Sequence, residues 1–132
     1  MASELELIAG LNTRLNTLPD SPPVAWENVK YSPDGENYLE QRYLAAEGFT
    51  VGVSQGGADV LAGIYQITVN TKKSRGLAES ATLVEAIRAH FARSSTLTQG
   101  DTRIVIHKVW SGAALPDEVY YKVPVSVRVR GV

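Results

Sequence analysis

The sequence predicts an α+β protein with an antiparallel or mixed β-sheet of four to six strands and two α-helices packed on one face. Residues 63–70 and 119–130 alternate between apolar and polar side chains, the period of two that is typical of half-buried strands. Residues 3–17 and 77–91 repeat apolar side chains every three or four positions, which is typical of amphipathic helices. Most connections are too short for parallel crossovers, so strands should pair mainly with antiparallel neighbours.

The length and composition point to one domain, covering residues 1–132. The chain has no cysteine, which excludes disulfides and thiolate metal sites. The acidic start is too polar for a signal peptide, and no apolar run approaches the roughly 20 residues of a membrane span. We therefore expect a protein made and used in a cytosol-like compartment, with no membrane contact.

The net charge of −1 hides an asymmetry along the chain. Residues 1–71 hold three basic and nine acidic residues, a net charge of −6, whereas residues 72–132 hold ten basic and five acidic residues, a net charge of +5. A solvated surface is the simple interpretation. The alternative is head-to-tail contact between copies, in which a negative surface meets a positive one.

The first half of the chain predicts one helix followed by strands. Ser3 is a suitable N-cap for a helix over residues 3–17, and Gly10 within it suggests close packing or a helix held by its tertiary contacts. Prolines 22 and 23 then lead into a short strand over 24–29, and a second strand is expected over 38–44. The glycine-rich residues 48–59 predict a hairpin tip or loop, because a phosphate-binding loop would need a Gly-Lys-Ser/Thr ending.

The second half predicts the strand over 63–70, a basic turn over 71–76, the helix over 77–91 and two further strands. Residues 96–101 read as the turn into a strand over 102–110. The final strand contains Pro124, which cannot donate a ladder hydrogen bond, so we expect this strand at a sheet edge or across a bulge. A long edge strand is safer when a neighbour covers it.

No group of residues in the sequence predicts a catalytic, cofactor or metal site. His90 falls in the last turn of a helix, where an imidazole can cap carbonyl groups, and His107 falls within a strand. Neither has a carboxylate or a second histidine at metal-binding spacing. The sequence also lacks a Gly-x-Ser-x-Gly elbow and a paired-carboxylate site.

The basic turn and the tryptophans are the remaining candidates for contacts. Lys72, Lys73 and Arg75 could form a solvated turn, bind a protein partner or touch phosphates; the slightly acidic chain argues against a nucleic-acid module. Trp26 and Trp110 are expected in the core, with an interface between chains as the alternative.

Six segments resemble, in the same order and spacing, the small tail terminator-like proteins of long-tailed (siphovirus-type) bacteriophages. The similarity runs over most of the chain. The segments are Val24–Val29, Tyr38-Leu39, Gly63–Val69, Gly76, Ala89–Phe91 and Tyr120–Val125.

This resemblance implies a structural virion protein that forms a ring, commonly a hexamer, on the head-proximal end of the tail tube. Such a ring stops tube polymerisation and presents the surface for head-tail joining, with viral DNA passing through its lumen without specific binding. The implied partners are sibling subunits, the tail tube protein and head-tail connector proteins, met in the host cytoplasm during assembly. We expect the subunit contacts to involve Lys72, Lys73, Arg75, Trp110, Arg128 and Arg130.

A weaker hypothesis is that the 48–59 loop or other acidic segments face the lumen and repel DNA. Two alternatives to a terminator stay open. One is another head-tail connector or tail-completion protein, and the other is a small ligand-binding or enzymatic α+β domain with a pocket between sheet and helices.

Overall fold

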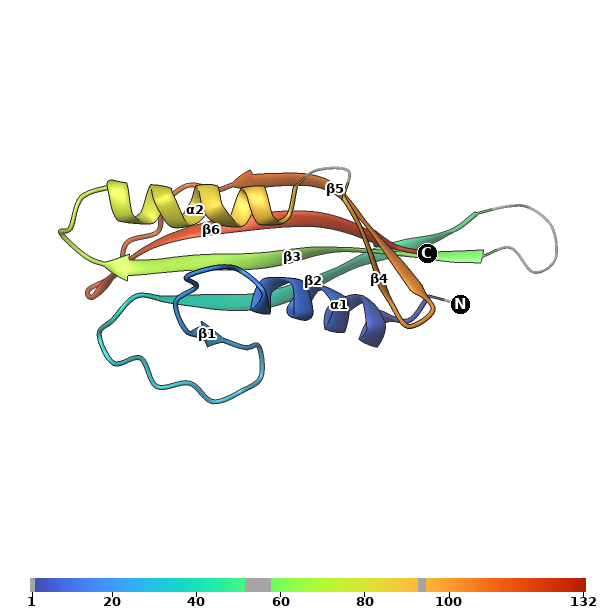
Figure 1. The fold of residues 1–132 in the computed structure, drawn as a ribbon, viewed down its shortest axis with the longest axis horizontal. Helices are drawn as coiled ribbons and strands as arrows, with labels where there is room; N and C mark the ends of the chain where they lie inside the picture. The colour runs from blue at the N-terminus through green and yellow to red at the C-terminus, as the bar shows by residue number, and fades with distance from the viewer. Residues whose placement is uncertain (1, 52–57, 93–94) are drawn as a thin grey trace.

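The computed structural model describes residues 2–51, 58–92 and 95–132. It has an α+β fold in which a curled sheet runs along the length of the molecule and both helices lie on one side of it (Figure 1). The predicted fold class is therefore confirmed. In chain order the elements are α1 (Glu4–Asn16), β1 (Val24–Ala25), β2 (Tyr38–Val51), β3 (Ala58–Lys72), α2 (Ala78–His90), β4 (Thr96–Gln99), β5 (Thr102–Ser111) and β6 (Tyr120–Gly131).

The sheet has six strands in the order β1-β2-β3-β6-β5-β4. It is mixed, because β1 pairs with β2 in parallel while the other four pairings are antiparallel. The last strand of the chain, β6, lies between β3 and β5. The prediction that this strand forms an edge was wrong.

Pro124 is tolerated in this central strand because of where β5 ends. The Pro124 carbonyl accepts a hydrogen bond from the Gly112 amide at 2.8 Å, one residue beyond Ser111, the last paired residue of β5. In a strand, the carbonyl and the N–H of one residue point to the same side. The N–H that Pro124 lacks would therefore face the end of the β5–β6 ladder, where no further β5 residue needs it. The proline marks the end of one neighbour rather than the edge of the sheet.

Three strand boundaries also differ from the prediction. Residues 96–99 form β4 instead of a turn, and the turn itself is made by Gly100, which has a φ of +58°, and Asp101. The first strand is only Val24–Ala25, because the chain turns at Asn28, which has a φ of +61°. Strands β2 and β3 extend into both ends of the segment predicted as a hairpin tip or loop over 48–59, through residues 48–51 and 58–59; residues 52–57 lie outside the described part of the chain.

The core fills the space between one face of the sheet and the two helices. Alternate residues of the central strands form one side of the core, and one apolar stripe of each helix forms the other side. This agrees with the strand and helix periodicities of the sequence. Fully burying such a side chain contributes about 1.5–3 kcal/mol. The most buried contributors are Leu7, Leu11, Leu15, Leu39, Tyr65, Ile67, Val69, Ile87, Phe91, Ile104, Ile106, Val125, Val127 and Val129.

Helix α1 packs closely on the sheet at Gly10. A Cβ at this position would lie 2.5 Å from Ile104 Cδ1, so any larger residue would force Ile104 or the helix to shift from the observed close approach to β5. Close packing at Gly10 is thereby confirmed. Ser3 caps the helix as predicted, with its hydroxyl accepting from the Glu6 amide at 3.4 Å.

No helix in the described residues is long and apolar enough to span a membrane.

Candidate subunit interface

The side of the sheet opposite the helices is covered at one end only. There, Tyr31 packs on Tyr38, with ring centroids 5.1 Å apart, and the Tyr38 ring meets Tyr120 edge-on. Along the rest of this side, no helix of the described residues lies on the sheet (Figure 1). We call this surface the open face and define it by Leu44, Ala46, Ala62, Ile64, Lys108, Trp110, Arg128 and Arg130.

Positive charge is concentrated on this side of the sheet. Strand alternation directs seven of the thirteen Lys and Arg residues to it, whereas Glu40 is the one acidic strand residue, among the side chains described, that points the same way. The charge asymmetry along the sequence thus becomes a difference between surfaces. The seven cations are Arg42, Lys72, Arg103, Lys108, Lys122, Arg128 and Arg130.

Two cations face each other at the centre of this basic region. Lys108 lies directly opposite Arg128 in the β5–β6 register, and both are placed over the Trp110 ring, at 5.5 and 5.6 Å from its centroid. Like charges in directly opposite positions destabilise a sheet, while a cation–π contact at an exposed site contributes about 0.5–1 kcal/mol. Trp110 is half-buried and lies outside the core.

The structure therefore brings together three of the predicted contact residues, Trp110, Arg128 and Arg130. Sequence reasoning missed Lys108, because its direction depends on an irregularity in the ladder. The register shifts between Ile106 and Lys108. Without that bulge, an even-numbered Lys108 would share the covered side with Ile106.

The basic turn lies elsewhere. Lys72 lies eight residues along β3 from Ile64, the residue that pairs with Arg128, so the two basic regions are separated by about 26 Å. The Lys72 ammonium is 2.8 Å from Glu36 Oε1, and Arg75 is 3.7 Å from Glu79.

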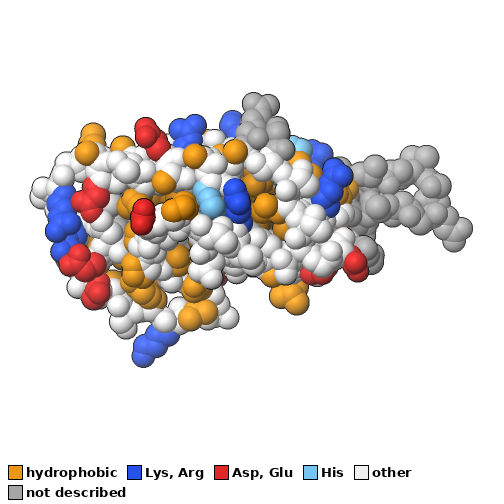
Figure 2. Space-filling view, viewed as in Figure 1, with side chains coloured by type: hydrophobic (Ala, Val, Ile, Leu, Met, Phe, Trp, Pro, Cys, Tyr) orange, Lys and Arg blue, Asp and Glu red, His pale blue; other side chains and the backbone are white. Residues whose placement is uncertain are grey.

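Two cations of the turn thus already have acidic partners, while Lys73 is exposed. Figure 2, which views the helix side, shows charges of both signs gathered at the end of the molecule where β3 leads into α2.

A second ion-pair group lies at the covered end of the sheet. Lys122 Nζ is 3.2 Å from Glu40 Oε1 and 3.6 Å from Asp117 Oδ2. Burial alone would lower the pKa of Lys122, but the hydrogen bond and charge of Glu40, together with the nearby Tyr38 and Asp117, outweigh it and raise the pKa above its usual value. The amides of Tyr120 and Val119 donate to the Asp117 carboxylate and lower its pKa. The charges of Lys122, Glu40 and Asp117 are therefore paired within the chain, where they stabilise the turn that leads into β6.

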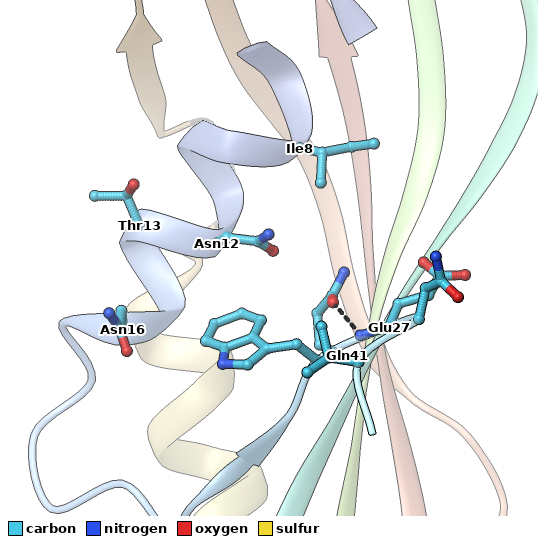
Figure 3. Close-up of a pocket in the computed structure, with 9 residues that line it drawn as sticks. Ile8, Asn12, Thr13, Asn16, Glu27 and Gln41 are labelled. Atoms are coloured by element: carbon cyan, nitrogen blue, oxygen red, sulfur yellow. Dashed lines mark hydrogen bonds between the residues drawn. The ribbon is translucent and has the colours of Figure 1, made fainter. Parts of the chain in front are cut away.

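A crevice of about 580 Å³ lies between α1 and the loop after β1 (Figure 3). Three of its polar side chains are committed to the fold: Gln41 Oε1 accepts from the Glu27 amide, the Glu27 carboxylate accepts from the Tyr43 amide at 2.8 Å, and Asn12 accepts from the Tyr65 hydroxyl at 2.6 Å. Burial raises the Tyr65 pKa. The crevice therefore offers shape and amide groups, without a pair of titratable side chains arranged for acid–base chemistry.

The histidines are not arranged as metal ligands in the described residues. His90 Nε2 lies 2.7 Å from the Arg14 carbonyl, and Arg14 Nε donates to the His90 carbonyl at 3.0 Å, so each residue serves the other helix's last turn. His107 is half-buried in β5 at the bulge. No group of three or more His, Cys, Asp or Glu residues within the described ranges could hold a metal ion.

Comparison with known proteins gives a family and a fold. The family described as "phage tail terminator protein" matches residues 6–128. A solved structure with 20% sequence identity superposes with a TM-score of 0.79, covering 98% of this chain and 96% of the other, and shows that the fold is shared. No curated protein matches the chain.

Proposed function

Because the chain belongs to the phage tail terminator protein family, and hence to the structural proteins of the virion tail, we propose that it closes into a ring, a hexamer, on the head-proximal end of the tail tube. The ring stops polymerisation of the tube and provides the surface to which head-tail connector proteins attach. The family match over residues 6–128 is the observation that carries this proposal.

The charge distribution supports ring closure. A ring needs a heterologous contact, in which one surface of a subunit meets a different surface of the next. The open face is basic, whereas the chain as a whole has a net charge of −1, so the other surfaces together are acidic. Opposite charges on different surfaces favour head-to-tail association and disfavour like-to-like contact.

The mechanism of such a ring is geometric and needs no bond to be made or broken. One side of the ring matches the shape that the last ring of tube subunits presents. The other side lacks the features that would recruit a further tube subunit, and connector proteins bind there. Assembly takes place in the host cytoplasm, and viral DNA passes through the lumen without specific binding.

We propose that the two basic regions make different contacts in this assembly. The turn with Lys72, Lys73 and Arg75 and the β6 residues Arg128 and Arg130 lie too far apart to touch one site on a partner. One region would then serve the neighbouring subunit and the other a neighbouring ring. The idea that the 48–59 loop faces the lumen stays a proposal, since residues 52–57 are outside the described part of the chain.

The test measures the mass of the purified protein alone and with tail tubes, and the length distribution of tubes grown with and without it. We expect a ring and tubes of arrested length. Reversing Lys72, Lys73 and Arg75 to glutamate should impair ring formation or attachment, whereas Lys30→Glu with Arg88→Glu, which changes exposed cations elsewhere, should not. A monomer that never caps a tube would refute the proposal and favour the ligand-binding alternative.

A further inference from the structure

The open face has two chemically different halves. Its β2 and β3 half is an apolar patch, with Leu44 38% exposed and Ile64 half-buried beside Ala46 and Ala62, and it is flanked on the same side by Arg42 and Gln66. Its β6 and β5 half is cationic and contains the half-buried Trp110. The register joins the halves in a continuous row, because Leu44 pairs with Ile64, and Ile64 pairs with Arg128.

The apolar half and the cationic half together indicate what kind of partner would fit the open face. Duplex DNA would satisfy the cations, but its phosphate backbone would gain nothing from the apolar half. Protein interfaces, in contrast, combine an apolar centre with arginine and tryptophan. The occupant should therefore be a protein surface that carries an exposed aliphatic side chain next to a carboxylate.

The first turn of α1 presents such a surface. Leu5 is 78% exposed, the highest value among the large apolar side chains described, and Glu4 is exposed next to it. Within the described residues, Glu4 makes no ion pair or side-chain hydrogen bond. Glu6 differs, because its carboxylate accepts from the Asp101 amide at 3.2 Å and from the Thr102 hydroxyl at 3.0 Å.

We propose that the first turn of α1 from one copy docks on the open face of the next copy, with Leu5 against Leu44 and Ile64 and with Glu4 beside Arg128. The two surfaces lie on opposite sides of the sheet, so a copy does not satisfy its own open face. The contact is heterologous and repeats from copy to copy. It rests on the proposed ring and identifies which surfaces close it.

The experiment is a charge swap, measured by sedimentation and by mass determination of the full chain over a concentration series. Glu4→Arg and Arg128→Glu should each weaken self-association about tenfold or more, because each places like charges together. The double variant should recover most of the loss. Leu5→Ala should weaken association by about tenfold, since it removes the apolar anchor.

Matched controls separate the contact from general effects of charge and hydrophobicity. Glu85→Arg makes the same charge change on the exposed surface of α2, and Leu115→Ala shortens another exposed leucine. Both should associate like the wild type. Circular dichroism and thermal denaturation of each variant should show the same folded monomer.

The possible results distinguish this contact from the ring itself. Rings that form unchanged in Glu4→Arg and Leu5→Ala would overturn the contact while leaving the ring proposal intact. Single variants that weaken association without recovery in the double variant would also overturn it. Retention of a 25-base-pair DNA duplex at about 0.15 M salt, lost in Arg128→Glu, would assign the open face to nucleic acid instead.

Discussion

The two faces of the same sheet differ in what their side chains do. On β3, Ile67 is fully buried under the helices, whereas Ile64, three residues earlier, is half-buried on the open face. The covered face contains apolar side chains in close contact, and the open face contains opposed cations that disfavour the folded monomer. One alternating pattern thus supplies the packed core on one side of the sheet and an exposed basic and apolar surface on the other.

The largest expected difference in stability is between two isoleucine-to-alanine variants, one on each face of the sheet. Ile67→Ala should lower the free energy of unfolding by about 2–5 kcal/mol, because it leaves a cavity in the core. Ile64→Ala should cost less than about 1 kcal/mol in the monomer, since fewer atoms surround the removed groups. Urea denaturation of both variants measures the difference. Equal losses would mean that the open face is packed in the monomer.

A smaller effect is expected at Gly10. Alanine favours an isolated helix by about 1 kcal/mol over glycine, but an added methyl group would clash with Ile104 Cδ1, at a cost of about 1–3 kcal/mol. Gly10→Ala should therefore destabilise by about 1 kcal/mol, measured by denaturant titration. Ile104→Val removes the clashing atom, so the double variant should be more stable than the sum of the single changes predicts. Strict additivity would contradict the close approach.

The turn before β6 gives a pH-dependent effect. The Asp117 pKa is lowered below 3.8 in the folded state, so its contribution to stability is fully present above that value and is lost as the pH falls through the folded pKa. Asp117→Asn should melt at a lower temperature than the wild type near neutral pH, and the difference should shrink at about pH 2.5. A difference in melting temperature that does not change with pH would exclude this role.

The smallest effect is expected at the opposed cations. Arg128→Gln should change the free energy of unfolding of the monomer by no more than about 0.5 kcal/mol, because it removes a like-charge opposition along with a cation–π contact. Lys122→Gln is the matched control. Its ammonium is paired with Glu40 and Asp117, and its loss should cost up to about 1 kcal/mol. Thermal denaturation at low salt compares the two, and a large loss at Arg128 would assign it a structural role.

Local sequence patterns predicted where the helices and strands lie along the chain better than they predicted which strands are neighbours in the sheet. The period of two located β3 and β6, and the apolar repeats located both helices within one or two residues. Strand order was not predictable in the same way. Pro124 was interpreted as an edge signal, whereas its missing donor faces the end of β5, which depends on the length of a different strand.

The residues of the proposed contact surfaces were predicted only in part, for a related reason. Alternation along β6 singled out Arg128 and Arg130. Trp110 was expected in the core, with an interface as the alternative, and the core expectation was wrong because Trp110 is half-buried outside the core. Lys108 was missed because a bulge changes the side to which it points, and a bulge leaves no mark in a short apolar strand. Leu5 fits the apolar spacing of residues 3–17, which predicts a buried side chain, yet it is exposed.

The free backbone edge of β2 is a site at which strands from other molecules could add without limit. Beyond the two residues that pair with β1, the backbone edge of β2 has no neighbouring strand in the described residues, and the Glu27 carboxylate occupies part of it by accepting a hydrogen bond from the Tyr43 amide. A carboxylate held at a free edge hinders the addition of a strand from another molecule. In the proposed ring, such a carboxylate would favour closed assemblies over amyloid-like fibres.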